Sequence, residues 1–216
     1  LGGAANLGTE SITLPGQIDD ALYIEPLHLQ IVCDRLWQKV QPVAGDVITL
    51  KHLGTSSDVD SALRGFYDDT VARVAAKTGT DERSIRDWFQ GELILGKGGM
   101  RGRGIRGEHR SGSLDTDTAD ALVEAKVVNR ELRLNTDRFE LSHDRLIPAV
   151  RSSNTDWYQR HLTEFQHKAR TWEEQGRPNR ELLSPREWLQ ATQHAQRPGI
   201  HLREYEQRFL DVSAAS

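Results

Sequence analysis

The spacing of the apolar residues changes period along the chain, and this change limits the possible folds more than any other feature. Between Val128 and Leu141, apolar and polar residues alternate on either side of the run Asn135-Thr136-Asp137. Alternation around a short polar turn predicts a β-hairpin. Before and after it, apolar residues recur every three or four positions, which predicts amphipathic helices. The chain is therefore expected to be mainly α-helical with one small β-hairpin.

Three helices are expected before the hairpin. The first covers about residues 60–77 and ends at Gly79, the second follows Thr80, and the third covers about residues 115–125. Their apolar stripes contain Leu63, Phe66, Tyr67, Val71, Val74, Ile85, Trp88, Phe89, Leu93, Leu122 and Val123. Three helices followed by a hairpin is the order of a winged helix, which we expect over residues 57–155.

A helical arm is expected ahead of the winged helix, within residues 1–56. Its helix should cover residues 22–40, with Pro26 in the first turn, where the missing N–H costs little. Apolar residues at spacings of three and four would form one face of this helix. These residues are Leu29, Val32, Leu36 and Val40.

A C-terminal helical stalk is expected over residues 156–216. The apolar spacing predicts one helix over residues 158–172, which Gly176-Arg177-Pro178 should end. Ser184-Pro185-Arg186-Glu187 is a capping box with proline at the first helical position, so a second helix should begin there. A last amphipathic helix is expected over residues 202–212.

The overall composition excludes several classes of protein. The 216 residues are 37% hydrophobic, and the apolar runs are too short to cross a bilayer. No signal-peptide pattern opens the chain, and the single Cys33, expected in the core, excludes an internal disulfide. We therefore expect a cytoplasmic protein without a membrane partner. Because the chain begins with Leu1 and Met100 is its only methionine, we expect it to be a segment of a longer chain.

The sequence lacks the motifs of a self-sufficient enzyme. The run Gly96-Lys97-Gly98-Gly99 has no hydroxyl residue after its lysine, so it does not form a phosphate-binding P-loop. H-E-x-x-H, paired C-x-x-C and G-x-S-x-G motifs do not occur, and the eight histidines are scattered. We therefore expect neither a metal site nor independent catalysis.

His143 is the first candidate binding residue. By strand alternation it shares a face with Phe139 and Leu141, and it lies where the second strand of the hairpin should pass into a helix that begins near Asp144. An imidazole there can donate a hydrogen bond to an anion beside the partly positive start of a helix. The alternative is that His143 is a structural histidine and that Asp144 only caps the helix.

A second candidate is the basic, glycine-rich stretch of residues 96–112. It could be a phosphate-seeking loop that binds nucleic acid. The alternative is a mobile, solvated loop between two helices of the winged helix, since no aromatic residue is interleaved to stack on bases. The basic residues of this stretch are Lys97, Arg101, Arg103, Arg106 and Arg110.

An ordered series of segments covers nearly the whole chain from about residue 20 and resembles novel-type STAND NTPases. The matching parts of that family are the helical arm after the nucleotide-binding core, the winged helix and the helical stalk. The segments are 24–37, 58–63 with Phe66-Tyr67, 84–89 with Glu92-Leu93-Ile94, 112–115, Leu122-Val123, 140–146, and in the tail Trp172, Gly176-Arg177-Pro178 and Phe209-Leu210.

The resemblance implies a nucleotide-binding role for two residues. In the family these segments close over ATP or ADP, which is bound mainly by a core that this chain lacks. Pro26 matches a proline near the adenine, although Ile24 stands where the family pattern has a glycine. His143 matches a histidine that contacts the β-phosphate of ADP, within Ser-His-Asp rather than Met-His-Asp. The parent chain would be an ATPase switch, with the upstream core and downstream repeat or effector domains as partners.

Three functions compete at this point. The first is a regulatory, nucleotide-sensing and autoinhibitory region of a STAND-type ATP/ADP switch, with no independent catalysis. The second is a winged-helix module that binds nucleic acid through residues 96–112. The third is a helical scaffold that links an upstream enzyme to downstream repeats.

Overall fold

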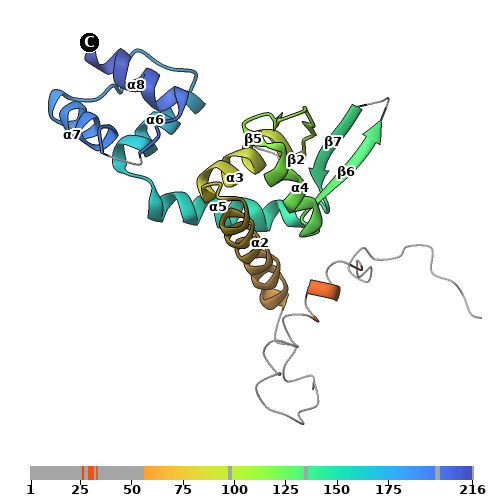
Figure 1. Cartoon of the computed structure of the whole chain (residues 1–216). Helices are drawn as coiled ribbons and strands as arrows, with labels where there is room; N and C mark the ends of the chain where they lie inside the picture. The colour runs from red at the N-terminus through yellow and green to blue at the C-terminus, as the bar shows by residue number, and fades with distance from the viewer. Residues whose placement is uncertain are drawn as a thin grey trace, which may run out of the picture. The chain divides into compact units, whose positions relative to one another are not determined.

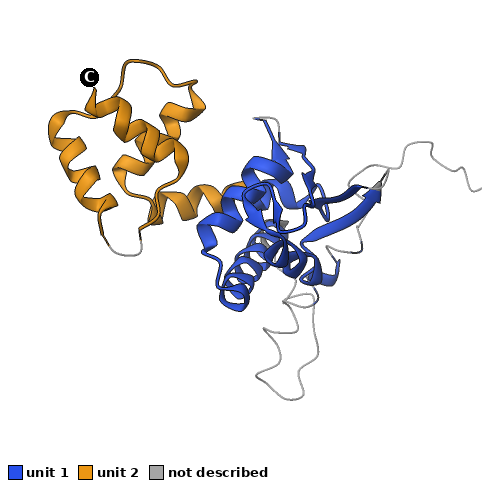
Figure 2. Ribbon diagram, turned by 45° about the horizontal axis from the view of Figure 1, so that its top comes forward, with its two compact units in different colours: residues 1–150 blue, residues 151–216 orange. Residues whose placement is uncertain are grey.

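The structure is a computed structural model that describes residues 26, 29–31, 33, 56–96, 99–133, 136–197 and 200–215. It consists of helices and short antiparallel strands. Figure 1 shows the order of the elements. The mainly helical character expected from the sequence is confirmed. The chain divides into two compact units, residues 1–150 and residues 151–216 (Figure 2), and each is described by itself.

From residue 56 onward, three described helical segments precede the hairpin in the first unit. They are α2 (Ser56–Thr78), α3 (Glu82–Trp88), which runs on into the π-helical turn η3 (Phe89–Leu93), and α4 (Thr116–Glu124). Asp81 and Asp115 cap α3 and α4, because each aspartate accepts a hydrogen bond from the backbone N–H three residues later. The predicted order of three helices and a hairpin is therefore present.

The predicted hairpin is part of a three-stranded sheet. Strands β6 (Val128–Arg133) and β7 (Thr136–Leu141) pair antiparallel, with Val128 opposite Leu141. Strand β3 (Gly104–Ile105) pairs with the other edge of β7, so the sheet order is β3-β7-β6. The expectation of a single hairpin was therefore incomplete, because the glycine-rich stretch supplies a further strand.

The described part of residues 96–112 contains short strands, although most of its residues are exposed. Strand β1 (Ile94–Leu95) pairs with β2 (Met100–Arg101), and β4 (Arg110–Ser111) pairs with β5 (Leu114–Asp115). The backbone N–H of Gly102 also donates to the carbonyl of Leu93 at 2.8 Å. A side chain at Gly102 would stand 2.2 Å from the carbonyl oxygen of Glu92, so glycine is needed for this close approach.

Aromatic rings hold the helices of the first unit against its sheet. Trp88 packs edge-on against Phe89 and Phe139, with ring centroids 5.6 and 6.0 Å apart, and Tyr67 meets Phe89 at 5.1 Å. All four side chains are fully buried. The core predicted from the helical stripes is confirmed at Leu63, Tyr67, Val71, Val74, Ile85, Trp88, Phe89, Leu93 and Leu122, while Phe66 and Val123 are half-buried at its edge.

The described residues of the arm are helical, but they bury a different face from the predicted one. Ile31 is 6% exposed and packs on the core, whereas Leu29 is 55% exposed. Two helical residues differ by about 200° around the axis, so burying Ile31 turns Leu29 outward. Cys33 is exposed, so its predicted core position was wrong. Val32, Leu36 and Val40 lie outside the described residues.

The stalk region contains two helices where one continuous helix was predicted. Helix α5 (Leu146–His161) ends before Thr163, and α6 (Glu164–Glu174) follows. Thr163 forms a capping box with Gln166, whose side chain accepts from the N–H of Thr163 at 3.0 Å. The apolar spacing stays in phase across the break, so periodicity alone did not reveal it. The Thr-x-x-Gln pattern was the overlooked indication.

The other boundaries of the stalk region follow the sequence. Helix α6 ends just before Gly176, whose φ is +80°, and α7 (Pro185–Ala195) begins after the Ser184 capping box. Helix α8 (Glu204–Ala214) closes the unit. The core of this second unit contains Phe165, Ala169, Trp172, Leu183, Ala191, Phe209 and Leu210.

Candidate functional site

His143 lies at the junction between β7 and α5, as the sequence predicted. Strand β7 ends at Leu141 and α5 begins at Leu146, so the residues between them form the turn. The carbonyl of His143 accepts from the N–H of Leu146 at 3.1 Å, which fixes the entry into the helix. His143 is half-buried, whereas Phe139 and Leu141 on the strand are fully buried.

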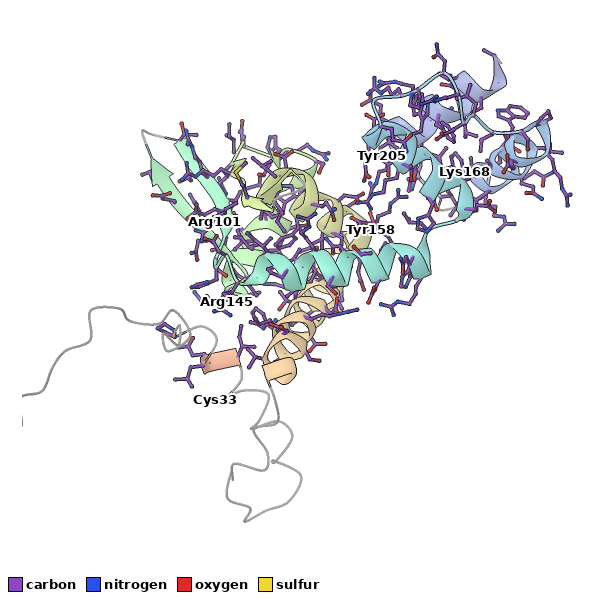
Figure 3. The ribbon with its side chains drawn as sticks, turned by 180° about the vertical axis from the view of Figure 1, so that it is seen from behind. Cys33, Arg101, Arg145, Tyr158, Lys168 and Tyr205 are labelled. Atoms are coloured by element: carbon purple, nitrogen blue, oxygen red, sulfur yellow. The ribbon has the colours of Figure 1, made fainter. Side chains whose placement is uncertain are left out.

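Arg101, whose side chain is labelled in Figure 3, connects the glycine-rich stretch to this junction. Its Nε donates to Oδ1 of Asp144 at 2.6 Å, and its Nη1 lies 3.5 Å from Oε1 of Glu140. Arg103 approaches the same Glu140, with Nε 3.6 Å from Oε2. Two arginines from one candidate region therefore meet two carboxylates from the other, although no sequence pattern indicated that they lie together.

A cleft of about 630 Å³ opens at this meeting point. Its charged lining comes from the two arginines and the two carboxylates, and its apolar lining includes Met100 of β2 and Ile147 of α5. Pro26 is helical and exposed and is not among the described residues that line the cleft. The described lining consists of Gly99, Met100, Arg101, Arg103, Glu140, Asp144, Ile147 and Pro148.

The remaining predicted basic residues have separate partners. Arg106 binds Asp120 of α4 through two hydrogen bonds, of which the shorter joins Nη2 to Oδ2 at 2.7 Å. This hydrogen bond raises the pKa of the Arg106 guanidinium. Arg110 donates to the carbonyls of Gly112 and Ser113, and Lys97 lies outside the described residues. Arg106 and Arg110 therefore have partners other than the two carboxylates of the cleft.

Helix α4 is acidic, which bears on the nucleic-acid hypothesis. In helix-turn-helix proteins the recognition helix enters the DNA major groove. Over Thr116–Glu124 the chain carries Asp117, Asp120 and Glu124 but no lysine or arginine. The partly buried Asp115 at its N-terminus has a pKa below the usual aspartate value. Burial raises this pKa, but the hydrogen bonds from Thr118 and Thr80 lower it by more.

A smaller cleft of about 270 Å³ lies between α6 and α7 in the second unit. Lys168, labelled in Figure 3, donates to Glu187 across this cleft and lies 3.8 Å from Glu164. Glu164 and Glu187 carry two negative charges against the one positive charge of Lys168, and Phe165 and Ala191 form part of the apolar lining. None of the candidate binding residues predicted from the sequence is among the described residues that line it.

Within the described part of the chain, no group of three histidine, cysteine, aspartate or glutamate side chains is arranged to hold a metal ion. Among these same residues, no helix combines the length and the apolar character that a membrane-spanning segment needs. Comparison of the chain with protein-family models, with curated proteins and with solved structures gave no match.

Proposed function

We propose that this chain is the nucleotide-sensing, autoinhibitory region of a STAND-type ATP/ADP switch and has no catalysis of its own. The observation that supports this most is the position of His143, half-buried between a strand end and the start of a sixteen-residue helix. A cleft with two arginines lies beside the next residue in the chain, Asp144. The proposed location of the protein is the cytoplasm.

The proposed contact is a hydrogen bond from the His143 imidazole to the β-phosphate of ADP. The start of α5 carries partial positive charge, which favours an anion nearby. A γ-phosphate would occupy the same space and push the winged helix away. One hydrogen bond to a charged group contributes roughly 1.5–3 kcal/mol, which biases a two-state hinge by about ten- to a hundredfold.

This role uses the chain's own residues for sensing, not for chemistry. The nucleotide would be held mainly by an upstream core, with the exposed Pro26 of the arm near its adenine. The guanidinium groups of Arg101 and Arg103 at the cleft can donate to the phosphate end of a nucleotide, and His143 precedes the cleft residue Asp144 in the same turn. Downstream repeat or effector domains are the other proposed partners.

Two observations favour the switch over a nucleic-acid-binding module. Arg106, which lies outside the cleft, is 2.7 Å from Asp120, and this carboxylate partly cancels its attraction to phosphate. In addition, the helix that would enter a DNA groove is acidic. A helical scaffold without a ligand would not need arginines gathered at a cleft beside the half-buried His143.

The experiment that tests the proposal is expression of the chain together with the residues that precede Leu1 in the parent protein. The purified protein is then denatured and assayed for released nucleotide. The proposal expects bound ADP, close to one molecule per chain. Absence of nucleotide, together with salt-dependent binding of mixed-sequence DNA to residues 1–216, would instead favour the nucleic-acid module.

A further inference from the structure

The two carboxylates at the cleft differ strongly in exposure. The Glu140 side chain is 16% exposed and lies between Arg101 and Arg103, at 3.5 and 3.6 Å. The Asp144 side chain is 69% exposed and forms an ion pair with Arg101. Glu140 is therefore a fixed part of the cleft wall, whereas Asp144 can rotate into solvent.

The pair between Arg101 and Asp144 is weak enough to be exchanged. Ion pairs between exposed side chains contribute little to stability, about 0–1 kcal/mol. The Arg101 side chain is 31% exposed, so another anion can approach its guanidinium from the cleft. An anion that offers two oxygens to the planar guanidinium competes well, because arginine binds phosphate in a bidentate manner.

We infer that Arg101 and Arg103 form a phosphate-binding site that Asp144 closes in the absence of ligand. The cleft is neutral as it stands, with two arginines and two carboxylates. When Asp144 turns away, the two arginines face Glu140 alone and the cleft carries one net positive charge. A phosphate group then replaces the aspartate on Arg101, and the cleft volume of about 630 Å³ accommodates it.

This inference deepens the proposed function and rests on it for the identity of the ligand as a nucleotide phosphate. It adds a phosphate contact at the cleft to the contact proposed for His143. It also makes Asp144 a competitor of the phosphate for Arg101. Phosphate binding would release the link between β2 and the start of α5. The state of the cleft would then report whether phosphate is present.

The test is titration of the 216-residue chain with inorganic pyrophosphate at low ionic strength, followed by NMR of the amide resonances. Asp144→Asn removes the competitor and should tighten binding roughly fivefold, the effect of one exposed ion pair. Arg101→Gln should abolish binding. Arg106→Gln is the matched control, because Arg106 pairs with Asp120 away from the cleft, and it should bind like the wild type.

The site would be overturned by no binding to either the wild type or Asp144→Asn, by no difference between these two, or by equal losses in Arg101→Gln and Arg106→Gln. Asp144→Asn is expected to bind pyrophosphate more tightly than the wild type, so it tests the site even if Arg101→Gln does not fold. Failure of the site is separable from failure of the proposed function, which is measured by ADP bound to the parent protein. Tighter binding of a single-stranded oligonucleotide than of pyrophosphate, weakened equally by both arginine variants, would also count against the site.

Discussion

The Nε atom of Arg101 lies 2.6 Å from Oδ1 of Asp144, although these residues stand 43 positions apart in the chain. The contact joins β2 to the turn that contains His143. It therefore connects the two regions that the sequence marked out separately, the glycine-rich basic stretch and the Ser-His-Asp run. Its strength decides whether this connection is permanent or exchangeable.

A double-mutant cycle on Arg101→Gln and Asp144→Asn measures that strength directly. The coupling free energy should be small, about 0.2–1 kcal/mol, because the Asp144 side chain is mostly exposed. Urea denaturation of the wild type, the two single variants and the double variant gives the value. A coupling above about 2 kcal/mol would mean a permanent tether and would contradict an exchangeable pair.

Gly102→Ala should destabilise the first unit by about 1–3 kcal/mol, because the new Cβ would overlap its neighbours. The ideal Cβ position lies 2.2 Å from the carbonyl oxygen of Glu92 and 2.9 Å from Cγ of Leu95. Gly91→Ala is the control, since no heavy atom lies within 4 Å of its Cβ position. Equal stabilities of the two variants in urea denaturation would show that β1 and β2 are not packed as described.

Lys126→Gly should stabilise the first unit by about 1 kcal/mol. Lys126 follows the end of α4 with a φ of +63°, a left-handed conformation that glycine adopts without strain. Lys126→Ala is the matched control, because it removes the same charge but keeps the Cβ that causes the strain. Thermal denaturation should place the glycine variant above the alanine variant, and the reverse order would contradict the backbone geometry.

The second unit should lose stability in acid through Glu187. Hydrogen bonds from Lys168 and Ser184 lower the pKa of its carboxyl from 4.5 to about 2. A carboxyl with a lowered pKa in the folded state adds stability above its unfolded value, and this is lost as the pH falls through the folded value. The contribution is therefore complete above about pH 4.5 and disappears toward pH 2.

The measurement is the Tm of the wild type and of Glu187→Gln between pH 6 and pH 2. Glutamine keeps the capping-box hydrogen bonds but not the charge. The wild type should melt at a higher temperature above pH 4.5, and the difference should shrink toward pH 2. Glu164→Gln, on a side chain that is 83% exposed, serves as the control for loss of one acid near Lys168. A difference that stays constant with pH would exclude the Lys168–Glu187 contact as its source.

Local patterns predicted the helices and the hairpin well, because burial of one face leaves a periodic trace. Phe139 and Leu141 alternate along β7 and are fully buried, and Ser184 begins α7 as its capping box indicates. The strands β1 to β5 were missed because each is only two residues long, which leaves no alternation to detect.

The candidate site was predicted only in part. The position of His143 at a strand end follows from alternation and a following helix, so the sequence was sufficient there. The approach of Arg101 and Arg103 to Glu140 depends on how the chain folds back between β2 and β7, and contacts between residues so far apart leave no local pattern. The partner of Arg106 on α4 was missed for the same reason.

The central claim is that His143 senses the phosphate of bound ADP, and the ADP dissociation rate of the parent protein tests it most directly. The rate is measured by displacement of a fluorescent ADP analogue, in His143→Ala and in the control His161→Ala, whose ring is exposed at the end of α5 in the second unit. The account predicts that ADP leaves the His143 variant about ten- to a hundredfold faster than the wild type, while the control is unchanged. Equal dissociation rates in all three proteins would contradict it.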